Sequence, residues 1–542
     1  MSIQLLPTDA ALAQPTLLEL LLQEQGELSA VECFSDWHES NSIASATYQA
    51  LMPATALQSG QQYAFEVDLD ACSGCKACVV ACHTLNGLEE TETWRKVGTL
   101  SSQRGATLPI VQHVTTACHH CVDPACLNGC PVQAYEKDPV TGIVRHLDDQ
   151  CFGCKYCTMM CPYEVPQYSS TLGIVRKCDM CSQRLGVGQA PACVQACPNQ
   201  AIRIAIVDVA TVIADTTVLK TNASLVPTAP SSRISMPTTK YLTTQPREAT
   251  ADLLSSESIV DSVHEGHLPL VAMIVLTQTS VGIWIVLATT NFQRTSPSSS
   301  FAAAFATAIG IVGVHAALLH LGRPWLAFRA FLGWRTSWLS REAIGFGLFM
   351  GAAITATGVP LVLPSQRLLH SLTAVSAAAI GVLAVMCTGM IYIATRRELW
   401  GYLRTGLDFG LSMIGLGVIG AFACVDGFTN FLPSVGVLCS IAAATPKLVD
   451  FFQSKSANTE WHNLSARSGR FLRRELAGPW ADFWILNLIA LVASVSLCII
   501  DWGDALPLVA FAIFGVSLFS QSIHRWLYFA SIVYRRMPGA ST

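Results

Sequence analysis

Sixteen cysteines between residues 72 and 197 fall into four groups of four, and they are the strongest chemical signal in the sequence. The groups are Cys72, Cys75, Cys78 and Cys82; Cys118, Cys121, Cys126 and Cys130; Cys151, Cys154, Cys157 and Cys161; and Cys178, Cys181, Cys193 and Cys197. The first and third groups have the spacing C-x2-C-x2-C-x3-C, which is typical of bacterial ferredoxins. Sixteen thiolates at this spacing are enough for four [4Fe–4S] clusters.

Two other uses of cysteine fit this pattern less well. Disulfides are disfavoured because cysteines separated by only two residues are poorly placed to bridge each other. Structural zinc also uses C-x2-C pairs, but it typically lacks the third cysteine and the trailing C-P. Here proline follows the last cysteine of three groups, at Pro131, Pro162 and Pro198. We therefore expect iron–sulfur clusters.

The residues around these cysteines carry a resemblance to a known family. The segments that carry it are Asp70-Ala-Cys-Ser-Gly-Cys-Lys-Ala-Cys, His120-Cys-Val-Asp-Pro-Ala-Cys, Tyr156-Cys-Thr-Met-Met-Cys-Pro-Tyr and Lys177-Cys-Asp-Met-Cys. Through them, residues 63–204 resemble the four-cluster iron–sulfur subunit of the dimethyl sulfoxide reductase family of molybdopterin oxidoreductases. In that family the two outer groups pair with each other and so do the two inner groups.

The resemblance implies four ligand sets in this chain. They are Cys72, Cys75, Cys78 with Cys197; Cys178, Cys181, Cys193 with Cys82; Cys118, Cys121, Cys126 with Cys161; and Cys151, Cys154, Cys157 with Cys130. Some relatives replace one cysteine of the third group and hold a three-iron cluster, so the presence of Cys154 favours four-iron clusters. The first group departs slightly, because His83 stands where the other groups have proline.

The second half of the chain has the composition of a membrane protein. Of the 542 residues 51% are hydrophobic and 13% are charged, and the mean hydropathy is +0.43. A membrane span needs about 20 apolar residues. Eight uncharged stretches are long enough to predict spans, at 268–289, 301–319, 343–363, 368–395, 409–425, 428–446, 483–500 and 505–523. The sixth is the weakest because it contains Pro433 and ends at Pro446. The net charge of −4 and the lack of a basic run argue against nucleic acid as a partner.

Basic residues predict the orientation of these spans. The loops after the second, fourth and sixth spans, together with the C-terminal tail, carry sixteen Lys and Arg, whereas the other loops carry only Arg294 and Arg367. Basic loops stay in the cytoplasm. With eight spans, the cluster domain and the C-terminus are therefore predicted to be cytoplasmic, on a bacterial inner membrane.

The membrane half carries a second resemblance. His320-Leu-Gly-Arg-Pro and Leu339-Ser-Arg-Glu-Ala are similar to the eight-helix anchor subunit of the same family, so the chain resembles a fusion of two usually separate subunits. In that family the residues matching His320 and Glu342 belong to the menaquinol site. The family's arginine shortly after the first motif falls on Leu326, so Arg323 or Arg329 would have to supply that charge.

His320 and Glu342 are residue types that can take part in the oxidation of a quinol. This oxidation releases two protons and two electrons, and it needs a histidine or carboxylate near the ring oxygens to accept protons. Other roles stay open: His320 could cap the second helix, and Glu342 could interact with the dipole of the third. His315 and His370 form no clear axial pair for haem.

The remaining segments are less informative. Residues 1–62 predict a helical arm with short helices at 16–25 and 29–39. Residues 1–14 contain no basic residue and no apolar core, so they are not expected to be a signal peptide. Residues 63–207 form the cluster domain, with short strands expected at 64–67, 143–147 and 202–207. Residues 208–263, rich in Thr, Ser and Pro, predict a linker or a strap that wraps the surface, and residues 264–542 form the anchor.

We therefore expect an α+β polyferredoxin domain of two bacterial-ferredoxin-like modules, followed by an all-α bundle of about eight transmembrane helices. The predicted function is electron transfer from menaquinol in the quinone pool, through four [4Fe–4S] clusters, to a separate molybdopterin-containing reductase subunit in anaerobic respiration. Alternatives are reverse flow from a hydrogenase, formate dehydrogenase or sulfur-compound dehydrogenase into quinone, and electron supply to a nitrate reductase. Ion translocation would need acidic or lysine residues buried within the helices, and the sequence shows no convincing chain of them.

Overall fold

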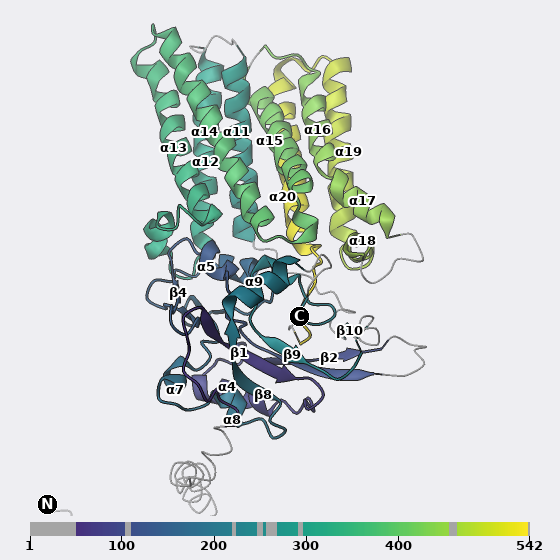
Figure 1. Ribbon diagram of the computed structural model, residues 1–542. Helices are drawn as coiled ribbons and strands as arrows, with labels where there is room; N and C mark the ends of the chain where they lie inside the picture. Colours follow the sequence, from purple (N-terminus) through teal and green to yellow (C-terminus); the bar gives the residue numbers. More distant parts are fainter. Residues whose placement is uncertain are drawn as a thin grey trace, which may run out of the picture.

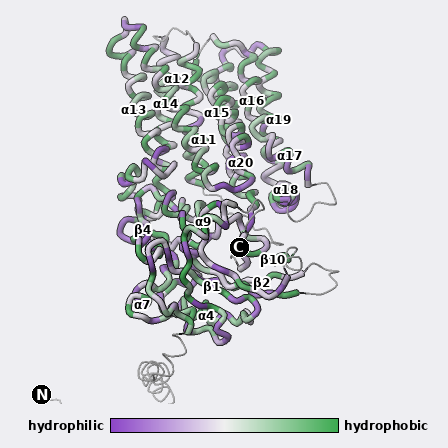
Figure 2. Tube along the Cα trace, in the orientation of Figure 1, coloured by the Kyte–Doolittle hydropathy of each residue, from purple (hydrophilic) through white to green (hydrophobic). Residues whose placement is uncertain are grey.

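The computed structural model describes residues 50–102, 110–218, 224–246, 253–255, 268–290, 296–425, 427–454 and 463–539. An α+β region lies at one end of a bundle of long helices (Figure 1). The bundle is largely hydrophobic, whereas the α+β region is mixed (Figure 2). The predicted fold class is confirmed, while the helices predicted in the N-terminal arm lie outside the described residues.

The α+β region is built on small sheets. β1 (Gln61–Asp68) lies between the antiparallel strand β8 (Ile202–Asp208) and the parallel strand β9 (Lys240–Leu242). A second sheet has the order β10 (Leu254–Ser255), β2 (Lys96–Ser101) and β3 (Val111–Thr116). Two hairpins pair β4 (Tyr135–Lys137) with β5 (Val144–His146) and β6 (Gln167–Ser169) with β7 (Ile174–Arg176). The strands expected at 64–67, 143–147 and 202–207 correspond to β1, β5 and β8.

Short helices accompany the cysteine loops. They are α4 (Ala77–Asn86), α5 (Ala125–Gly129), α6 (Tyr156–Met160), α7 (Ser182–Gly186) and α8 (Ala192–Gln195). The first and third cysteine groups fold alike, because Gly74 and Gly153 have φ angles of 72° and 73°, and Lys76 and Lys155 have φ angles of 62° and 60°. Glycine adopts this left-handed backbone without the steric cost of a Cβ. Each loop can therefore turn around the space where its thiols gather.

The segment after β8 wraps around the α+β region before the chain enters the bundle. Its described parts include α9 (Val209–Val218), the 3-10 helix η1 (Ser232–Ile234), β9 and β10. The Thr238 hydroxyl donates to the His119 carbonyl at 2.8 Å, and the Tyr241 hydroxyl donates to the Thr115 carbonyl at 3.2 Å. Of the two possibilities that the sequence left open, these contacts favour the strap.

The bundle contains seven helices, among the described residues, that are long and apolar enough to cross a membrane. They are α11 (Leu268–Thr289), α12 (Pro297–Ala316, continued by η3, Ala317–His320), α13 (Trp338–Val362), α14 (Arg367–Ala394), α15 (Tyr402–Cys424), α19 (Ala477–Ile499) and α20 (Leu506–Ala530, preceded by η6, Gly503–Ala505). A bent pair, α16 (Leu432–Ala443) and α17 (Thr445–Gln453), makes an eighth span if it is taken as one. All eight predicted stretches overlap these elements.

The weakest predicted span is the one that bends. α16 and α17 meet at 43°, and Pro446 occupies the first turn of α17, where its missing N–H leaves no helical hydrogen bond to break. After α17 the chain forms α18 (Leu464–Arg474), which buries Leu464, Phe471 and Leu472 and ends on two arginines. The sequence did not predict this amphipathic helix.

The C-terminal tail returns to the α+β region. Met537 is buried in the core of that region, and the Thr228 hydroxyl donates to the Arg536 carbonyl at 3.5 Å. The Tyr534 hydroxyl donates to the Glu164 carboxylate, and Arg536 lies 3.6 Å from the same carboxylate. The tail thus fastens the end of α20 to the α+β region.

Candidate cluster and quinol sites

The thiols regroup in space into four quartets, each named here by one member. The Cys154 quartet (Cys130, Cys151, Cys154, Cys157) and the Cys118 quartet (Cys118, Cys121, Cys126, Cys161) line two separate cavities. In the Cys72 quartet, Cys72 lies within electrostatic range of Cys75, Cys78 and Cys197. In the Cys178 quartet, Cys178 lies within electrostatic range of Cys82 and Cys181, and Cys82 lies within range of Cys181 and Cys193. These neighbourhoods match the four implied ligand sets, and ligation itself stays a prediction.

The quartets suit cubane clusters. Among the described residues, no three Cys, His, Asp or Glu side chains lie close enough to hold a single metal ion. Four thiols spread around a cavity are what a [4Fe–4S] cluster requires, because each thiolate binds a different iron. Burial raises the pKa of Cys82 to about 12 and that of Cys130 to about 11, so both thiols hold their protons at neutral pH. Cluster binding releases such protons and couples metal uptake to folding.

Single buried side chains lie between successive quartets. Tyr135 lies within electrostatic range of the Cys154 and Cys118 quartets, through Cys157 and Cys126. Lys177 interacts with the Cys118 and Cys178 quartets, and Arg95 interacts with the Cys178 and Cys72 quartets. The four quartets therefore form a row, in the order Cys154, Cys118, Cys178, Cys72.

The two ends of this row differ in their surroundings. At the Cys72 quartet, Cys75 is exposed, and α4 and α8 lie at the end of the α+β region away from the bundle (Figure 1). At the Cys154 quartet, the loop between α12 and α13 closes over the cysteines. The Gly333 N–H donates to the Pro131 carbonyl at 2.7 Å, and the Ser337 hydroxyl donates to the Gly129 carbonyl at 2.7 Å. The Cys154 quartet is therefore the one next to the membrane bundle.

Arg323 and Arg329 lie in this closing loop, which contains the 3-10 helix η4 (Pro324–Phe331). Arg323 donates through Nη1 to the Asp148 carbonyl at 3.1 Å, and Arg329 donates through Nη1 to the Asp149 carbonyl at 3.3 Å. Both guanidinium groups thus hold the α+β region against the loop. Their support of a quinol stays a prediction.

His320 and Glu342 lie at the same end of the bundle, but at different depths. Glu342 is 5% exposed in the second turn of α13, and its carboxylate accepts a hydrogen bond from the Thr388 hydroxyl of α14 at 2.6 Å. His320 ends η3 and is partly exposed. The next residues of its loop reach the Cys154 quartet, where the Gly322 N–H donates to the Gly153 carbonyl at 3.4 Å. Both candidates are thus close to the first quartet of the row.

Tyr156 is a residue of this site that the sequence analysis did not single out. It is 2% exposed, and its hydroxyl donates to the Ile391 carbonyl of α14 at 3.1 Å. It lies within electrostatic range of both Glu342 and Cys154. The only signal in the sequence was its position next to Cys157, which does not reveal a contact with a helix more than 200 residues away.

The structure also corrects the expectation that no ionisable chain is buried within the helices. Asp408 of α15 and His524 and Arg525 of α20 are each at most 2% exposed. The predicted spans began at Phe409 and ended at Ile523, because each was cut at the first charge. α15 begins earlier and α20 ends later, so these charges lie inside the helices.

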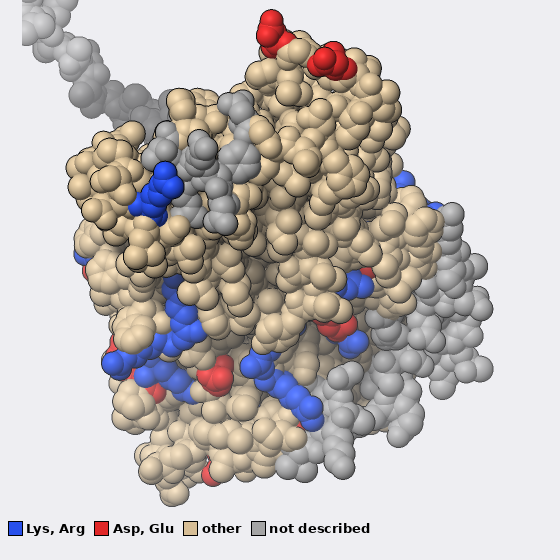
Figure 3. Space-filling view, turned by 90° about the horizontal axis from the view of Figure 1, so that it is seen from above, with Lys and Arg blue, Asp and Glu red and all other residues tan. Residues whose placement is uncertain are grey.

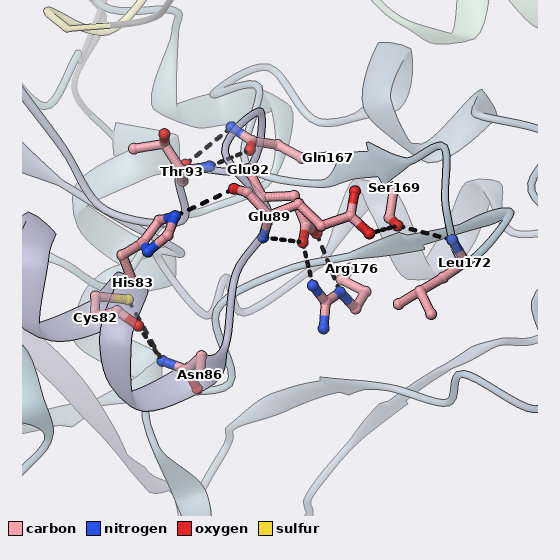
Figure 4. A network of polar contacts seen from close by, with 10 residues as sticks. All are labelled: Cys82, His83, Asn86, Glu89, Glu92, Thr93, Gln167, Ser169, Leu172 and Arg176. Atoms are coloured by element: carbon pink, nitrogen blue, oxygen red, sulfur yellow. Dashed lines mark hydrogen bonds and ion pairs between the residues drawn. The ribbon is translucent and has the colours of Figure 1, made fainter. Parts of the chain in front are cut away.

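A polar network holds the loop that follows Cys82 against the β6–β7 hairpin (Figure 4). Glu92 is fully buried in it and forms an ion pair with Arg176 of β7. The Asn86 amide donates to the Cys82 carbonyl at 2.7 Å and to its sulfur at 3.6 Å. Hydrogen bonds to ligating sulfurs help to set cluster potentials. The network therefore fixes the geometry of one thiol of the Cys178 quartet.

Lys177 leads to a prediction about cluster potentials. Burial disfavours its charge, but the thiolates of Cys118, Cys126 and Cys178 favour it, and the net effect raises the pKa of Lys177. A Lys177→Met substitution is expected to lower the potentials of the two adjacent clusters by on the order of 100 mV, because a positive charge that favours the electron is lost. Potentiometric titration followed by electron paramagnetic resonance measures the shift. Lys177→Arg, which keeps the charge, is the control, and unchanged potentials in Lys177→Met would contradict the assigned position between two clusters.

Comparisons with known proteins agree with this geometry. A family model for a 4Fe-4S dicluster domain matches residues 110–206, and a model for the DMSO reductase anchor subunit matches residues 263–529. The protein is similar to one chain of the anaerobic dimethyl sulfoxide reductase of Haemophilus influenzae, at 36% identity over 156 residues, or 27% of this protein and 76% of that one. The corresponding reductase chain of Escherichia coli K12 is 37% identical over 154 residues, or 27% of this protein and 75% of that one.

A further relative belongs to another system. The hydrogenase-2 operon protein HybA of Escherichia coli O157:H7 is 36% identical over 160 residues, or 25% of this chain and 49% of that protein. Together with the anchor model, the two dimethyl sulfoxide reductase relatives account for both halves of the structure. The chain therefore belongs to the dimethyl sulfoxide reductase family, as an iron–sulfur electron-transfer subunit fused to the membrane anchor subunit.

Proposed function

We propose that this chain carries electrons from menaquinol in the membrane, through four [4Fe–4S] clusters, to a separate molybdopterin-containing reductase subunit. The observation that carries the proposal is the row of four quartets, which starts beside the bundle near Glu342 and ends at the partly exposed Cys72 quartet. The bound clusters would supply the one-electron carriers that a two-electron quinol needs.

The entry to this path is proposed at His320 and Glu342. A buried carboxylate that receives one hydrogen bond, from Thr388, keeps a free oxygen with which it can accept a proton from a quinol hydroxyl. His320, at the edge of the bundle, offers the second proton acceptor. Tyr156 is buried and lies within electrostatic range of both Glu342 and Cys154, so it lies on the proposed path between the quinol and the first cluster.

The exit is proposed at the Cys72 quartet. The relatives from Haemophilus influenzae and Escherichia coli each bear the name of one chain of a dimethyl sulfoxide reductase, so a chain with the catalytic site is the expected partner. Cys75 is exposed, and nearby Val80 is 63% exposed and Leu85 is 48% exposed on α4. This apolar surface beside the outermost quartet is where we propose that the catalytic subunit docks.

The α+β region is proposed to face the cytoplasm. The basic loops between α12 and α13 and between α14 and α15 lie at its end of the bundle, where Arg396 donates to the Arg233 carbonyl at 3.4 Å. The opposite end is mostly uncharged (Figure 3), and its charged residues include Arg367 at the start of α14 and Asp501 and Asp504 between α19 and α20. By the positive-inside rule, this distribution of charge supports a cytoplasmic α+β region.

Reverse electron flow is the second candidate. The similarity to HybA, whose name places it in a hydrogenase operon, favours a module that receives electrons from a dehydrogenase and reduces quinone. The ligands alone do not set the direction, because cluster potentials span about −700 to +450 mV.

Rapid mixing of the purified protein with a reduced menaquinol analogue tests the proposal. In anaerobic detergent solution, we expect electron paramagnetic resonance to show the signals of reduced clusters soon after the quinol is added. Iron and sulfide analysis should give four [4Fe–4S] clusters per chain. Clusters that stay oxidised with quinol, but reduce quinone after reduction with dithionite, would overturn the proposed direction in favour of reverse flow.

A further inference from the structure

A group of charged and polar side chains is buried inside the bundle, separate from His320 and Glu342. Asp408 of α15 lies 2.8 Å from Arg525 Nη2 and 3.5 Å from His524 Nε2, both on α20. Gln278 of α11 adds its amide oxygen 3.5 Å from Arg525 Nη2. Three helices thus converge on these four residues, which we call the bundle polar site.

The bundle polar site has more hydrogen-bonding atoms than protein partners. Nδ1 of His524, Nε and Nη1 of Arg525, and Nε2 of Gln278 are buried, and none has a hydrogen-bond partner among the described residues. Buried polar groups in proteins are almost always hydrogen-bonded, either to protein or to ordered water. Internal waters typically bridge such otherwise unsatisfied groups. The bundle polar site can therefore bind water or another polar group in addition to its ion pair.

A purely structural ion pair would look different. Arg525 stays charged in proteins, so Asp408 neutralises it without help from a histidine. His524 adds a group that can take a proton at one nitrogen and release it at the other. The groups that influence the His524 ring are Asp408 from α15, Arg525 from its own helix and Lys447 from α17. Ionisable residues inside a membrane bundle are functional candidates by default.

One side of the bundle polar site leads toward Glu342. Tyr392 of α14 lies within electrostatic range of both Glu342 and Arg525. Its ring centre is 5.7 Å from that of Tyr528, over which the Arg525 guanidinium lies at 5.2 Å. Tyrosine hydroxyls can both donate and accept hydrogen bonds. The side chains between Glu342 and Arg525 therefore include two buried tyrosine hydroxyls, which lie among packed aromatic rings.

The other side leads to the surface next to the α+β region. Lys447 of α17 lies within electrostatic range of both Asp408 and Asp450. Asp450 pairs with Arg404 at 2.9 Å, and the Arg404 side chain is 30% exposed. Buried charge thus continues from the bundle polar site to solvent at this end of the bundle.

We propose that the bundle polar site, centred on Asp408 and His524, conducts protons released by quinol oxidation near Glu342 to the surface at Asp450 and Arg404. The inference rests on the proposed function. Oxidation of one quinol breaks two O–H bonds and yields quinone, two electrons and two protons. The electrons pass to the clusters. Glu342 takes up a proton and passes it by way of the hydroxyls of Tyr392 and Tyr528 to His524, which releases it toward Asp408, Lys447 and the surface, so every group returns to its starting state.

Two variants test the path with a matched control. His524→Gln leaves the Asp408–Arg525 ion pair in place, and Asp408→Asn removes the carboxylate charge while keeping its shape. We expect each to slow quinol-driven cluster reduction at least tenfold, to increase the solvent deuterium isotope effect and to delay proton release to a pH-indicator dye. Reduction by dithionite should remain at the wild-type rate. Asp482→Asn, which removes an exposed carboxylate of α19, should behave as wild type.

The outcomes separate this inference from the proposed function. If wild-type clusters are not reduced by quinol, the proposed function fails and the proton path fails with it. If the wild type is reduced but His524→Gln and Asp408→Asn match it in rate, isotope effect and proton release, only the proton path is overturned. Should Asp408→Asn not fold, His524→Gln decides alone, because it leaves the ion pair intact.

Discussion

Replacing Glu342 by glutamine is expected to slow the reduction of the clusters by quinol roughly a hundredfold or more, the usual contribution of a general base. Glutamine can keep the hydrogen bond from Thr388, which Glu342 accepts at 2.6 Å, but it cannot take a proton. The substitution removes proton transfer without removing packing. The rate is measured by mixing the variant with a reduced menaquinol analogue and freezing samples for electron paramagnetic resonance.

The control for this variant is an acidic residue on the same side of the bundle. Glu398 lies in η5 (Glu398–Trp400), where its 59% exposed side chain pairs with Arg535 at 3.4 Å. Glu398→Gln should reduce its clusters at the wild-type rate. Iron content and dithionite reduction should be unchanged in both variants. A Glu342→Gln protein that accepts electrons from quinol as fast as the wild type would remove Glu342 from the proton-accepting role.

A Cys154→Ser substitution is expected to abolish quinol-driven reduction of the other three clusters while they remain bound. Cys154 belongs to the quartet beside the bundle, so its loss damages the first cluster of the row. Without that cluster, electrons from the quinol would have to travel directly to the Cys118 quartet, which lies farther from the bundle. Dithionite, which reaches the exposed Cys72 quartet from solution, should still reduce the remaining clusters.

Cys439→Ser provides the comparison, because Cys439 is a partly buried thiol of α16 outside the quartets. It should keep all iron and the wild-type rate. Equally fast reduction of the outer clusters in Cys154→Ser and in Cys439→Ser would mean that quinol electrons enter at another quartet. The order of the row would then have to be revised.

Several features could be predicted from the sequence because short stretches of chain encode them. The ferredoxin spacing places three thiols of the first group and three of the third within one loop each, and the left-handed backbone at Gly74 and Gly153 shapes these two loops in the same way. The eight apolar stretches encode the spans, since the length of a membrane helix is set by the thickness of the bilayer. α11 coincides residue for residue with its predicted span.

Other features depend on contacts between distant segments. The order of the quartets follows from where Tyr135, Lys177 and Arg95 lie, and no spacing of cysteines contains that order. The hydroxyl of Tyr156 meets a carbonyl of α14 only because the loop between α12 and α13 holds the α+β region against the bundle. Likewise, β9 and β10 of the segment that follows β8 pair with the open edges of β1 and β2, which no local pattern in that segment reveals.

The sequence by itself determined the cluster chemistry, the number of apolar stretches and the family, because each is encoded in consecutive residues. Only the tertiary structure decided where charged residues could be buried. In the sequence, the charges at Asp408 and Arg525 border the apolar stretches, so each membrane span is predicted to stop before them. Across the bundle they lie 2.8 Å apart and neutralise each other, so both helices continue past them. An unpaired charge is costly in the membrane, and pairing between helices, which no single segment reveals, removes most of that cost.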